Sequence, residues 1–234
     1  RSNVGGLAGY ARSNNTLEAN TMMGSVESIY SGDADTGGLV GFVNFRNIIR
    51  ANLVSGRVAA EGDNVGGLIG FISNISNTVE GNLSSVWVEG SINLSTMGGL
   101  VGGARFSQDT LQNNYWATDA SGQLTSHLSS EANSYVGLEL ATLRCGVMAN
   151  TDYANSNCVS EDGAAEGLSG PVTVFKDWDT YGVTDTNGVF QPYWDFGSNQ
   201  QLPALNLNGI IHRDSDGDGV ADNIDVYPLS FAAS

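Results

Sequence analysis

Residues Val65–Gly70 read VGGLIG, and three close copies of this block stand at Val4–Gly9, Thr36–Gly41 and Met97–Gly102. The first glycines of the four blocks fall at positions 5, 37, 66 and 98, so the spacing stays between 29 and 32 residues. A fixed period of about 30 residues is typical of repeat architectures, in which each unit forms one supersecondary structure. We therefore expect the first half of the chain to stack similar coils.

Each block has the pattern of a strand rather than of a helix. Side chains alternate with period two, and β-branched or aromatic residues occupy every second position. Paired glycines would destabilise a helix by about 1 kcal/mol each relative to alanine. They suit a strand that leaves a tight turn or that another backbone approaches closely. If the coils stack at about 4.8 Å, one leucine per block should lie in a single file. These leucines are Leu7, Leu39, Leu68 and Leu100.

An asparagine follows the second glycine of every block by 14 or 15 residues, at Asn20, Asn52, Asn82 and Asn114. Stacked asparagines can hydrogen-bond from one coil to the next, as in asparagine ladders. The repeats therefore predict an all-β protein, a right-handed parallel β-helix (β-solenoid) of about four to five coils with a C-terminal cap. We expect the right-handed sense because crossover connections between parallel strands are almost always right-handed. The alternative is a glycine-rich antiparallel sandwich whose repetition is coincidental.

The blocks resemble the GLUG repeat family, which is named for its Gly-Leu-any-Gly core. The matching segments are GGLAG at Gly5–Gly9, GGLVG at Gly37–Gly41, GGLIG at Gly66–Gly70 and GGLVG at Gly98–Gly102. The resemblance covers about half of the chain. It implies a secreted or surface-exposed bacterial protein with a scaffold or binding role, and it supplies no catalytic residues.

Composition limits the partners of this chain. Its 234 residues include 25 acidic and 9 basic side chains, which gives a net charge of −16. Nucleic acids and anionic membrane surfaces would be repelled, whereas cations would be attracted. With 31 glycines and only 15% charged residues, the chain is typical of a β-rich extracellular protein. No apolar run of 18 residues predicts a membrane span, so no insertion into a membrane is expected.

Three regions are expected: a repeat solenoid over residues 1–126, a cap over 127–209 and a tail over 210–234. The cap region holds Cys145 and Cys158, which we expect to form a disulfide in an extracellular chain. Free thiols or a redox pair are the alternatives. Two tryptophans, Trp178 and Trp194, are expected to cover the open end of the solenoid, because large aromatic rings bury much area. The alternative for these two rings is a platform on which a sugar stacks.

The tail carries the one motif with evident chemistry, DSDGDGVADNID at Asp214–Asp225. Alternate carboxylates in a tightly wound loop can converge on a hard cation such as Ca²⁺, which takes six to eight oxygen ligands. Gly219 permits the sharp turn, and the spacing matches an EF-hand loop with aspartate in place of the last glutamate. The expected ligands are Asp214, Asp216, Asp218, the carbonyl group of Val220, Asp222 and Asp225. The alternative is a solvated acidic linker.

The same segment resembles thrombospondin type 3 repeats, whose DxDxDGxxDxxD core it reproduces, and this resemblance implies a calcium-loaded linker. We therefore expect a non-catalytic structural, adhesive or filament-forming module, with itself or surface glycans as partners. The competing hypotheses are a carbohydrate-binding module and a part of a polysaccharide-degrading or peptidase β-helix protein. Neither histidine belongs to a recognisable catalytic motif.

Overall fold

The chain folds as a parallel β-solenoid, as the repeat period predicts. The computed structural model has 51% strand and 6% helix, and its coils make about three turns. The expectation of four to five coils is wrong, because four copies of a block bound only three complete turns. The structure describes residues 2–73, 76–91, 96–105, 109–126, 135–144, 159–160, 172–175, 177–198 and 200–230.

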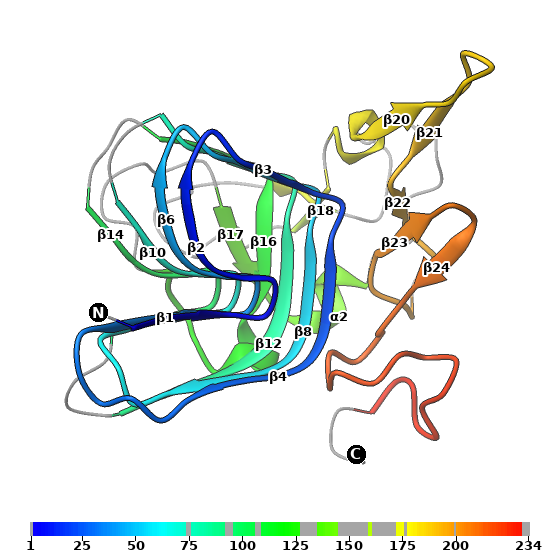
Figure 1. Ribbon diagram of the computed structural model, residues 1–234. Coiled ribbons are helices and arrows are strands. Elements are labelled where there is room, and N and C mark those ends of the chain that lie inside the picture. Colours follow the sequence, from blue (N-terminus) through cyan, green and yellow to red (C-terminus); the bar gives the residue numbers. More distant parts are fainter. Residues whose placement is uncertain are drawn as a thin grey trace.

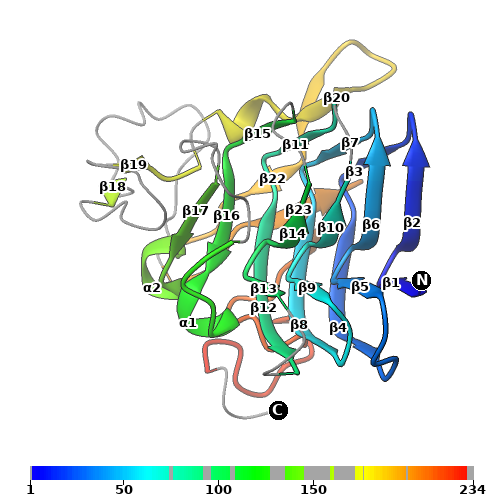
Figure 2. The same ribbon diagram turned by 90° about the vertical axis from the view of Figure 1, so that its left-hand side faces the viewer.

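Each turn contributes one strand to each of four parallel sheets, which we name after their first strands (Figures 1 and 2). The β1 sheet holds β1 (Ser2–Gly5), β5 (Ala34–Gly37), β9 (Asn64–Gly66) and β13 (Thr96–Gly98). The β2 sheet holds β2 (Ala8–Ser13), β6 (Val40–Phe45), β10 (Ile69–Ile72) and β14 (Val101–Ala104). The β3 sheet holds β3 (Thr16–Glu18), β7 (Ile48–Arg50), β11 (Thr78–Glu80) and β15 (Thr110–Gln112). The β4 sheet holds β4 (Thr21–Ser28), β8 (Leu53–Ala60), β12 (Leu83–Gly90), β16 (Asn114–Ala117) and β17 (Tyr135–Leu138).

The Gly-Gly-Leu block forms a corner between two sheets rather than one continuous strand. Strand β5 ends at Gly37 and β6 begins at Val40, so Gly38 and Leu39 make the bend. Leu39 and Val40 are both fully buried. Period-two alternation predicts that two consecutive side chains lie on opposite faces of one strand. Both are buried here because the chain turns the corner between the two sheets at this point. A Cβ atom on Gly37 would lie only 2.1 Å from the carbonyl oxygen of Val40 and 2.5 Å from the amide nitrogen of Gly70. Glycine is required here because the backbones of adjoining sheets almost touch.

The four leucines lie in a single file, as predicted. The amide of Leu7 donates to the carbonyl of Leu39 at 3.0 Å, that of Leu39 to Leu68 at 2.9 Å, and that of Leu68 to Leu100 at 2.8 Å. The three later leucines are fully buried, whereas Leu7, in the first coil, is 50% exposed. The stacked blocks therefore build the apolar core of the solenoid.

Two ladders of polar side chains run along the stack. In the predicted one, each side-chain amide donates to the next side-chain oxygen: Asn20 to Asn52 at 2.9 Å, Asn52 to Asn82 at 2.8 Å, and Asn82 to Asn114 at 2.8 Å. The second ladder, which ends on a carboxylate, was not predicted from the sequence. It runs through Asn15, Asn47, Asn77 and Asp109. Both ladders satisfy buried amide groups at the bends between strands.

The two ends of the solenoid differ. At the C-terminal end, Trp116 is fully buried and donates its indole N–H to the carbonyl of Gln123. The chain then folds back from α1 (Thr118–Ser121), and Gly99 donates its amide to the carbonyl of Thr125 at 3.1 Å. At the N-terminal end, strands β1 to β4 are the outermost members of their sheets among the described residues. At the C-terminal end, β13, β14, β15 and β17 are likewise the outermost described strands, and residues 122–126 cover only part of this edge through contacts with Gly99 and Val101.

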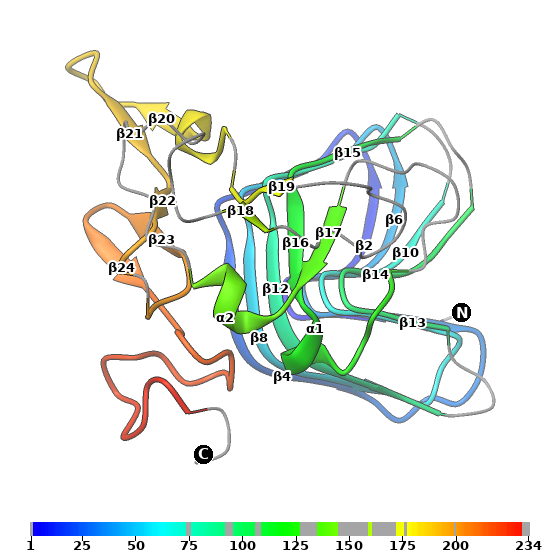
Figure 3. The same ribbon diagram turned by 180° about the vertical axis from the view of Figure 1, so that it is seen from behind.

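From residue 178 onward, the C-terminal segment lies along the outer face of the β4 sheet, whereas residues 159–160 and 172–173 lie beyond β17 at the end of the stack (Figures 1, 2 and 3). A second apolar core forms where it packs against side chains of β8, β12 and β16, among them Leu53, Leu83 and Tyr115. Trp178 and Trp194, which we expected over the open end of the solenoid, instead lie in this second core, because the outward apolar residues of the β4 sheet bury them at its side. The elements of the C-terminal segment are α2 (Leu140–Leu143), β18 (Val159–Ser160), β19 (Val172–Thr173), the 3₁₀ turn η2 (Trp178–Thr180), β20 (Gly182–Thr184), β21 (Phe190–Pro192), β22 (Trp194–Asp195), β23 (Ala204–Leu207) and β24 (Ile210–His212). Within the described ranges, no helix has the length and apolar character that crossing a bilayer would need.

Candidate metal centre

The aspartate-rich loop after β24 is docked on the outer face of the β4 sheet. The amide of Gly56 in β8 donates to the carbonyl of Gly217 at 3.0 Å. Gly217 and Gly219 have φ angles of +81° and +94°, which favour glycine. A Cβ atom on Gly217 would lie 2.7 Å from the carbonyl oxygen of Ser85. The loop thus touches the solenoid through its backbone.

The solenoid presents bare backbone at this docking point. Gly24 in β4 and Gly56 in β8 are paired neighbours with φ angles of +121° and +102°. A Cβ atom on Gly219 would lie 2.9 Å from the Cα atom of Gly56 and 3.0 Å from the amide nitrogen of Gly24. A side chain at Gly219 would therefore keep the loop away from the sheet. Gly24 and Gly56 occupy equivalent positions of two coils in the sequence, and this recurrence is a local signal for the docking point.

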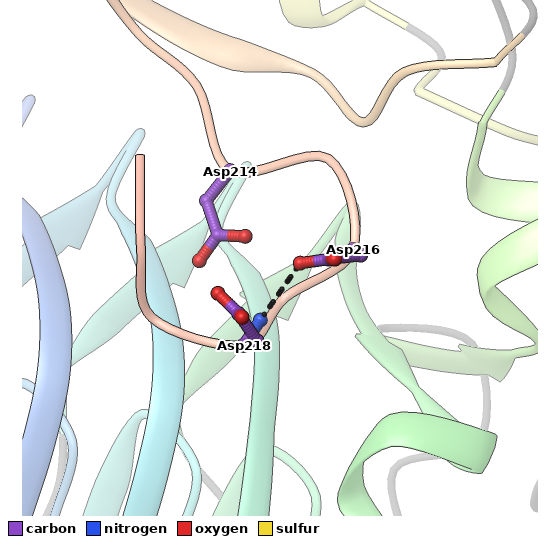
Figure 4. A group of neighbouring side chains, drawn as sticks. All are labelled: Asp214, Asp216 and Asp218. Carbon is purple, nitrogen blue, oxygen red and sulfur yellow. Dashed lines mark hydrogen bonds between the residues drawn. The ribbon is translucent and has the colours of Figure 1, made fainter. Parts of the chain in front are cut away.

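Three carboxylates converge inside the loop. One oxygen of each of Asp214, Asp216 and Asp218 lies within 4.8 Å of the others, and the three side chains face a common point (Figure 4). Asp214 and Asp216 are each only 1% exposed. Such a group could hold a metal ion, because carboxylate oxygens are the ligands that hard divalent cations prefer.

Backbone amides shape the loop around these carboxylates. Asp214 accepts hydrogen bonds from the amides of Gly217 and Gly219, each at 2.8 Å. Asp216 accepts from the amide of Asp218 at 3.2 Å, and Asp218 accepts from the amide of Val220 at 2.8 Å. The carboxylates are therefore held in place by the backbone of their own loop.

Without an ion, the clustered charges are unfavourable. Burial raises the pKa of Asp214 to about 7, although the amides of Gly219 and Gly217 oppose the shift. Burial also raises the pKa of Asp216, and the nearby carboxylates of Asp218 and Asp225 raise it further. A bound cation would relieve both the desolvation and the repulsion.

Outside this group of three carboxylates lie the remaining predicted ligands, Val220, Asp222 and Asp225. Asp225 lies near the cluster, since its charge raises the pKa of Asp216, but it is not one of the three carboxylates that converge within 4.8 Å. Asp222 instead accepts two hydrogen bonds from Ser215, one from its amide and one from its hydroxyl group, both at 2.6 Å. Val220 contributes its amide to Asp218, and no contact of its carbonyl group with the cluster is seen among the described residues.

Two carboxylate oxygens in the loop are buried from solvent. The Oδ2 atoms of Asp216 and Asp225 are buried, and within the described part of the chain neither has a hydrogen-bond partner. A buried carboxylate oxygen without a donor is costly unless a cation fills that role. The residues present thus fit a cation ligated by oxygen atoms.

Sequence reasoning missed the residues that hold the loop from outside. The Nε atom of Arg144, just after α2, donates to the carbonyl of Ser215 at 3.1 Å. Arg213 is 7% exposed and pairs with Asp195, while it also donates to the carbonyl of Leu202. No local pattern marks these two arginines, because their partners are 11 to 71 residues away in sequence.

The other predicted site residues are two tryptophans, which lie in the second core, and two cysteines, which the structure does not describe. Trp178 and Trp194 are 0% and 3% exposed, and their ring centroids are 4.3 Å apart in the second core. Neither ring offers a face on which a sugar could stack, because both pack against the β4 sheet and each other. Cys145 and Cys158 lie outside the described residues, so their disulfide stays a prediction.

Comparisons of the chain with known protein families, with curated proteins and with solved structures found no match. The function is therefore inferred from the geometry of the loop and of the solenoid.

Proposed function

We propose that this chain is a non-catalytic structural and adhesive module of a bacterial surface or secreted protein, in which Ca²⁺ fastens the C-terminal segment to the solenoid. The observation that carries the proposal is the docked aspartate loop with its two buried carboxylate oxygens. An ion at that point would stabilise both the loop and its contact with β8. The resemblances to GLUG repeats and to thrombospondin type 3 repeats support the location and the metal.

Calcium is the favoured ion because every side-chain ligand in the loop is a carboxylate. Asp214, Asp216, Asp218 and Asp225 supply oxygen atoms only, and nitrogen or sulfur ligands that would favour zinc are lacking among the described residues of the loop. Ca²⁺ accepts irregular geometry and several water ligands, whereas Mg²⁺ demands a near-ideal octahedron. A net charge of −16 also raises the local concentration of divalent cations.

The structural part of the proposal is supported by the ladders. Polar side chains along the stack bond to their own copies in neighbouring coils, which stiffens the solenoid. The open strand edges at β1 to β4 suit self-association, since unpaired edges can pair with another copy. At the C-terminal end, Trp116 and the segment after α1 cover part of the edge. Association through the β1 to β4 edges alone would produce pairs, whereas association through both ends would produce the filaments expected from the sequence.

Calorimetry with Ca²⁺ and Mg²⁺ tests the metal centre. The wild-type protein should bind Ca²⁺ more tightly than Mg²⁺, and Asp216→Asn should abolish the heat of binding. The control is Asp185→Asn, which changes a partly exposed aspartate outside the loop that accepts amide hydrogen bonds from Asn187 and Val189. An unchanged isotherm for Asp216→Asn would exclude this loop as the site.

The structural and adhesive role needs a separate test. Sedimentation velocity across a concentration series should show self-association, as dimers if only the β1 to β4 edges pair and as larger species if both ends do. Beads coated with the protein should be retained on immobilised glycans or bacterial surfaces. Release of sugars or peptides from a substrate panel by the purified protein would contradict the non-catalytic assignment.

A further inference from the structure

One side chain of the solenoid lies beneath the aspartate loop. Ser55 in β8 directly precedes Gly56, whose amide donates to the carbonyl of Gly217 at 3.0 Å. Leu53, two residues earlier on the same strand, packs in the second core on the outer face of the β4 sheet, so the side chain of Ser55 projects from that face as well. Ser55 is nevertheless fully buried. The docked loop therefore covers this serine.

The hydroxyl group of Ser55 faces the carboxylate of Asp214. Burial raises the pKa of Asp214 to about 7, and among the groups that oppose this shift the Ser55 hydroxyl has the largest effect. Within the described part of the chain, however, the Oγ atom of Ser55 makes no hydrogen bond of ordinary geometry. A fully buried hydroxyl group without a partner costs free energy. Ser55 thus has an unused donor directed at one of the three converging carboxylates.

A second serine under the loop has a different environment. Ser85 in β12 is paired in register with Ser55 and is also fully buried. Its hydroxyl group donates to the backbone carbonyl of Val54 at 3.4 Å, so its donor is used within the solenoid. A Cβ atom on Gly217 would lie 3.2 Å from the Oγ atom of Ser85, which places this serine against the loop too. The two serines therefore share burial and location but differ in what their hydroxyl groups contact.

The carboxylate of Asp214 can accept a hydrogen bond from the serine and still ligate an ion. An ionised carboxylate offers about four lone-pair positions to donors and cations. The amides of Gly217 and Gly219 take one position on each oxygen, both at 2.8 Å. A hydrogen bond from Ser55 would use a third position. The fourth is then left for a cation shared with the neighbouring carboxylates.

The donors that surround Asp214 are neutral, which favours metal binding. The two arginines beside the loop bind other groups: Arg144 donates to the carbonyl of Ser215, and Arg213 pairs with Asp195. A guanidinium group on Asp214 would neutralise this carboxylate and compete with a cation. A hydroxyl group instead orients the carboxylate and leaves its charge available to the ion.

We propose that Ser55 is a positioning residue of the metal centre, whose hydroxyl group donates to Asp214 when this carboxylate ligates the ion. The inference rests on the metal centre proposed above and adds that the solenoid itself completes the site. Ion binding gives the buried hydroxyl group a charged acceptor, so part of the binding free energy is gained only while the loop is docked on β8. Groups that orient a metal ligand in this way typically change metal affinity by about 10- to 100-fold.

Calorimetry with Ca²⁺ on Ser55→Ala and Ser85→Ala tests the proposal. Each variant removes one buried hydroxyl group, and the two positions are paired neighbours under the loop. Ser55→Ala should weaken Ca²⁺ binding by at least about tenfold. Ser85→Ala is the matched control and should bind Ca²⁺ within about twofold of the wild type, because its hydroxyl group contacts the solenoid backbone.

Melting temperatures separate a positioning role of Ser55 from a structural one. In chelator, Ser55→Ala should melt no lower than the wild type, because it removes a buried hydroxyl group that lacks a hydrogen bond among the described residues. Added Ca²⁺ should raise its melting temperature less than that of the wild type, since a weaker site stabilises the folded state less. An equal decrease in chelator and in Ca²⁺ would show a purely structural role and overturn the proposal.

The remaining outcomes distinguish this inference from the metal centre itself. Wild-type protein that binds no Ca²⁺ would refute the metal centre and the role of Ser55 with it. Ca²⁺ binding that Asp216→Asn abolishes but Ser55→Ala leaves unchanged would refute only the role of Ser55. The same conclusion would follow if Ser85→Ala weakened Ca²⁺ binding as much as Ser55→Ala.

Discussion

The amide of Gly56 in the solenoid donates a hydrogen bond of 3.0 Å to the carbonyl of Gly217 in the aspartate loop. This contact joins the two parts of the molecule, because β8 belongs to the repeats and the loop ends the C-terminal segment. It forms only because both residues are glycines with positive φ angles, which lets backbone approach backbone. Metal binding and the docking of the segment should therefore be coupled.

Gly217→Ala should weaken Ca²⁺ binding by about tenfold or more. A methyl group at this position would lie 2.7 Å from the carbonyl oxygen of Ser85 and would displace the loop from the sheet. The control is Gly188→Ala, because Gly188 has a φ angle of +80° but no atom lies within 4 Å of the point that its methyl group would occupy. Calorimetry on both variants separates the lost contact from the backbone strain that they share. Equal affinities in the two variants would contradict the coupling.

Removal of Ca²⁺ should loosen the C-terminal segment before the solenoid unfolds. Without the ion, the repelling carboxylates of Asp214, Asp216 and Asp218 would favour an undocked loop. Limited proteolysis in chelator should cut near residues 213–225, and added Ca²⁺ should protect this region. Hydrogen exchange should at the same time leave the amides of β6, β10 and β14 protected. Cleavage that begins within the coils would show that the ion is not specific to this loop.

Asn52→Ala should destabilise the protein by about 2–4 kcal/mol, because it leaves buried donors and acceptors unpaired in two neighbouring coils. Asn52 is fully buried, accepts from Asn20, and donates to Asn82 and to the carbonyl of Leu17. The half-buried Asn20 is the control, since Asn20→Ala changes the first rung of the same ladder. Chemical denaturation should give a clearly smaller loss for Asn20→Ala. Equal losses would show that burial does not set the strength of the ladder.

Asp109→Asn should stabilise the protein at neutral pH. Burial raises the pKa of Asp109, even though the backbone and side-chain amides of Asn77 donate to its carboxylate. A carboxyl group with a raised pKa favours the folded state most when it is protonated, and this contribution is lost as the pH rises through its folded pKa. Asparagine would accept the same hydrogen bonds without a charge. The gain in melting temperature should be present at pH 7 and should shrink toward pH 4, and a gain that is independent of pH would contradict this account.

Repetition explains why the solenoid could be predicted from the sequence. Leu39, Leu68 and Leu100 recur at intervals of 29 and 32 residues, and similar coils bury them by stacking. The asparagines from Asn20 to Asn114 follow the same logic, since a buried amide at a repeated bend finds its partner in the next copy. The aspartate motif was equally local, because a 12-residue loop contains its own ligands and the glycines that wind it.

Only the tertiary structure decided where the unrepeated parts lie. Trp178 and Trp194 were expected to cap the solenoid, with a sugar platform as the alternative, and they pack in a core because the β4 sheet offers outward-facing apolar side chains. Arg57 pairs with Glu27 and Glu89 because strand register places them on neighbouring strands, which no single repeat reveals. Gly56 and Gly217 are far apart in sequence and meet because the segment folds back along the coils. A repeated sequence determines its own neighbours, whereas contacts between unlike segments depend on which surfaces the finished coils leave exposed.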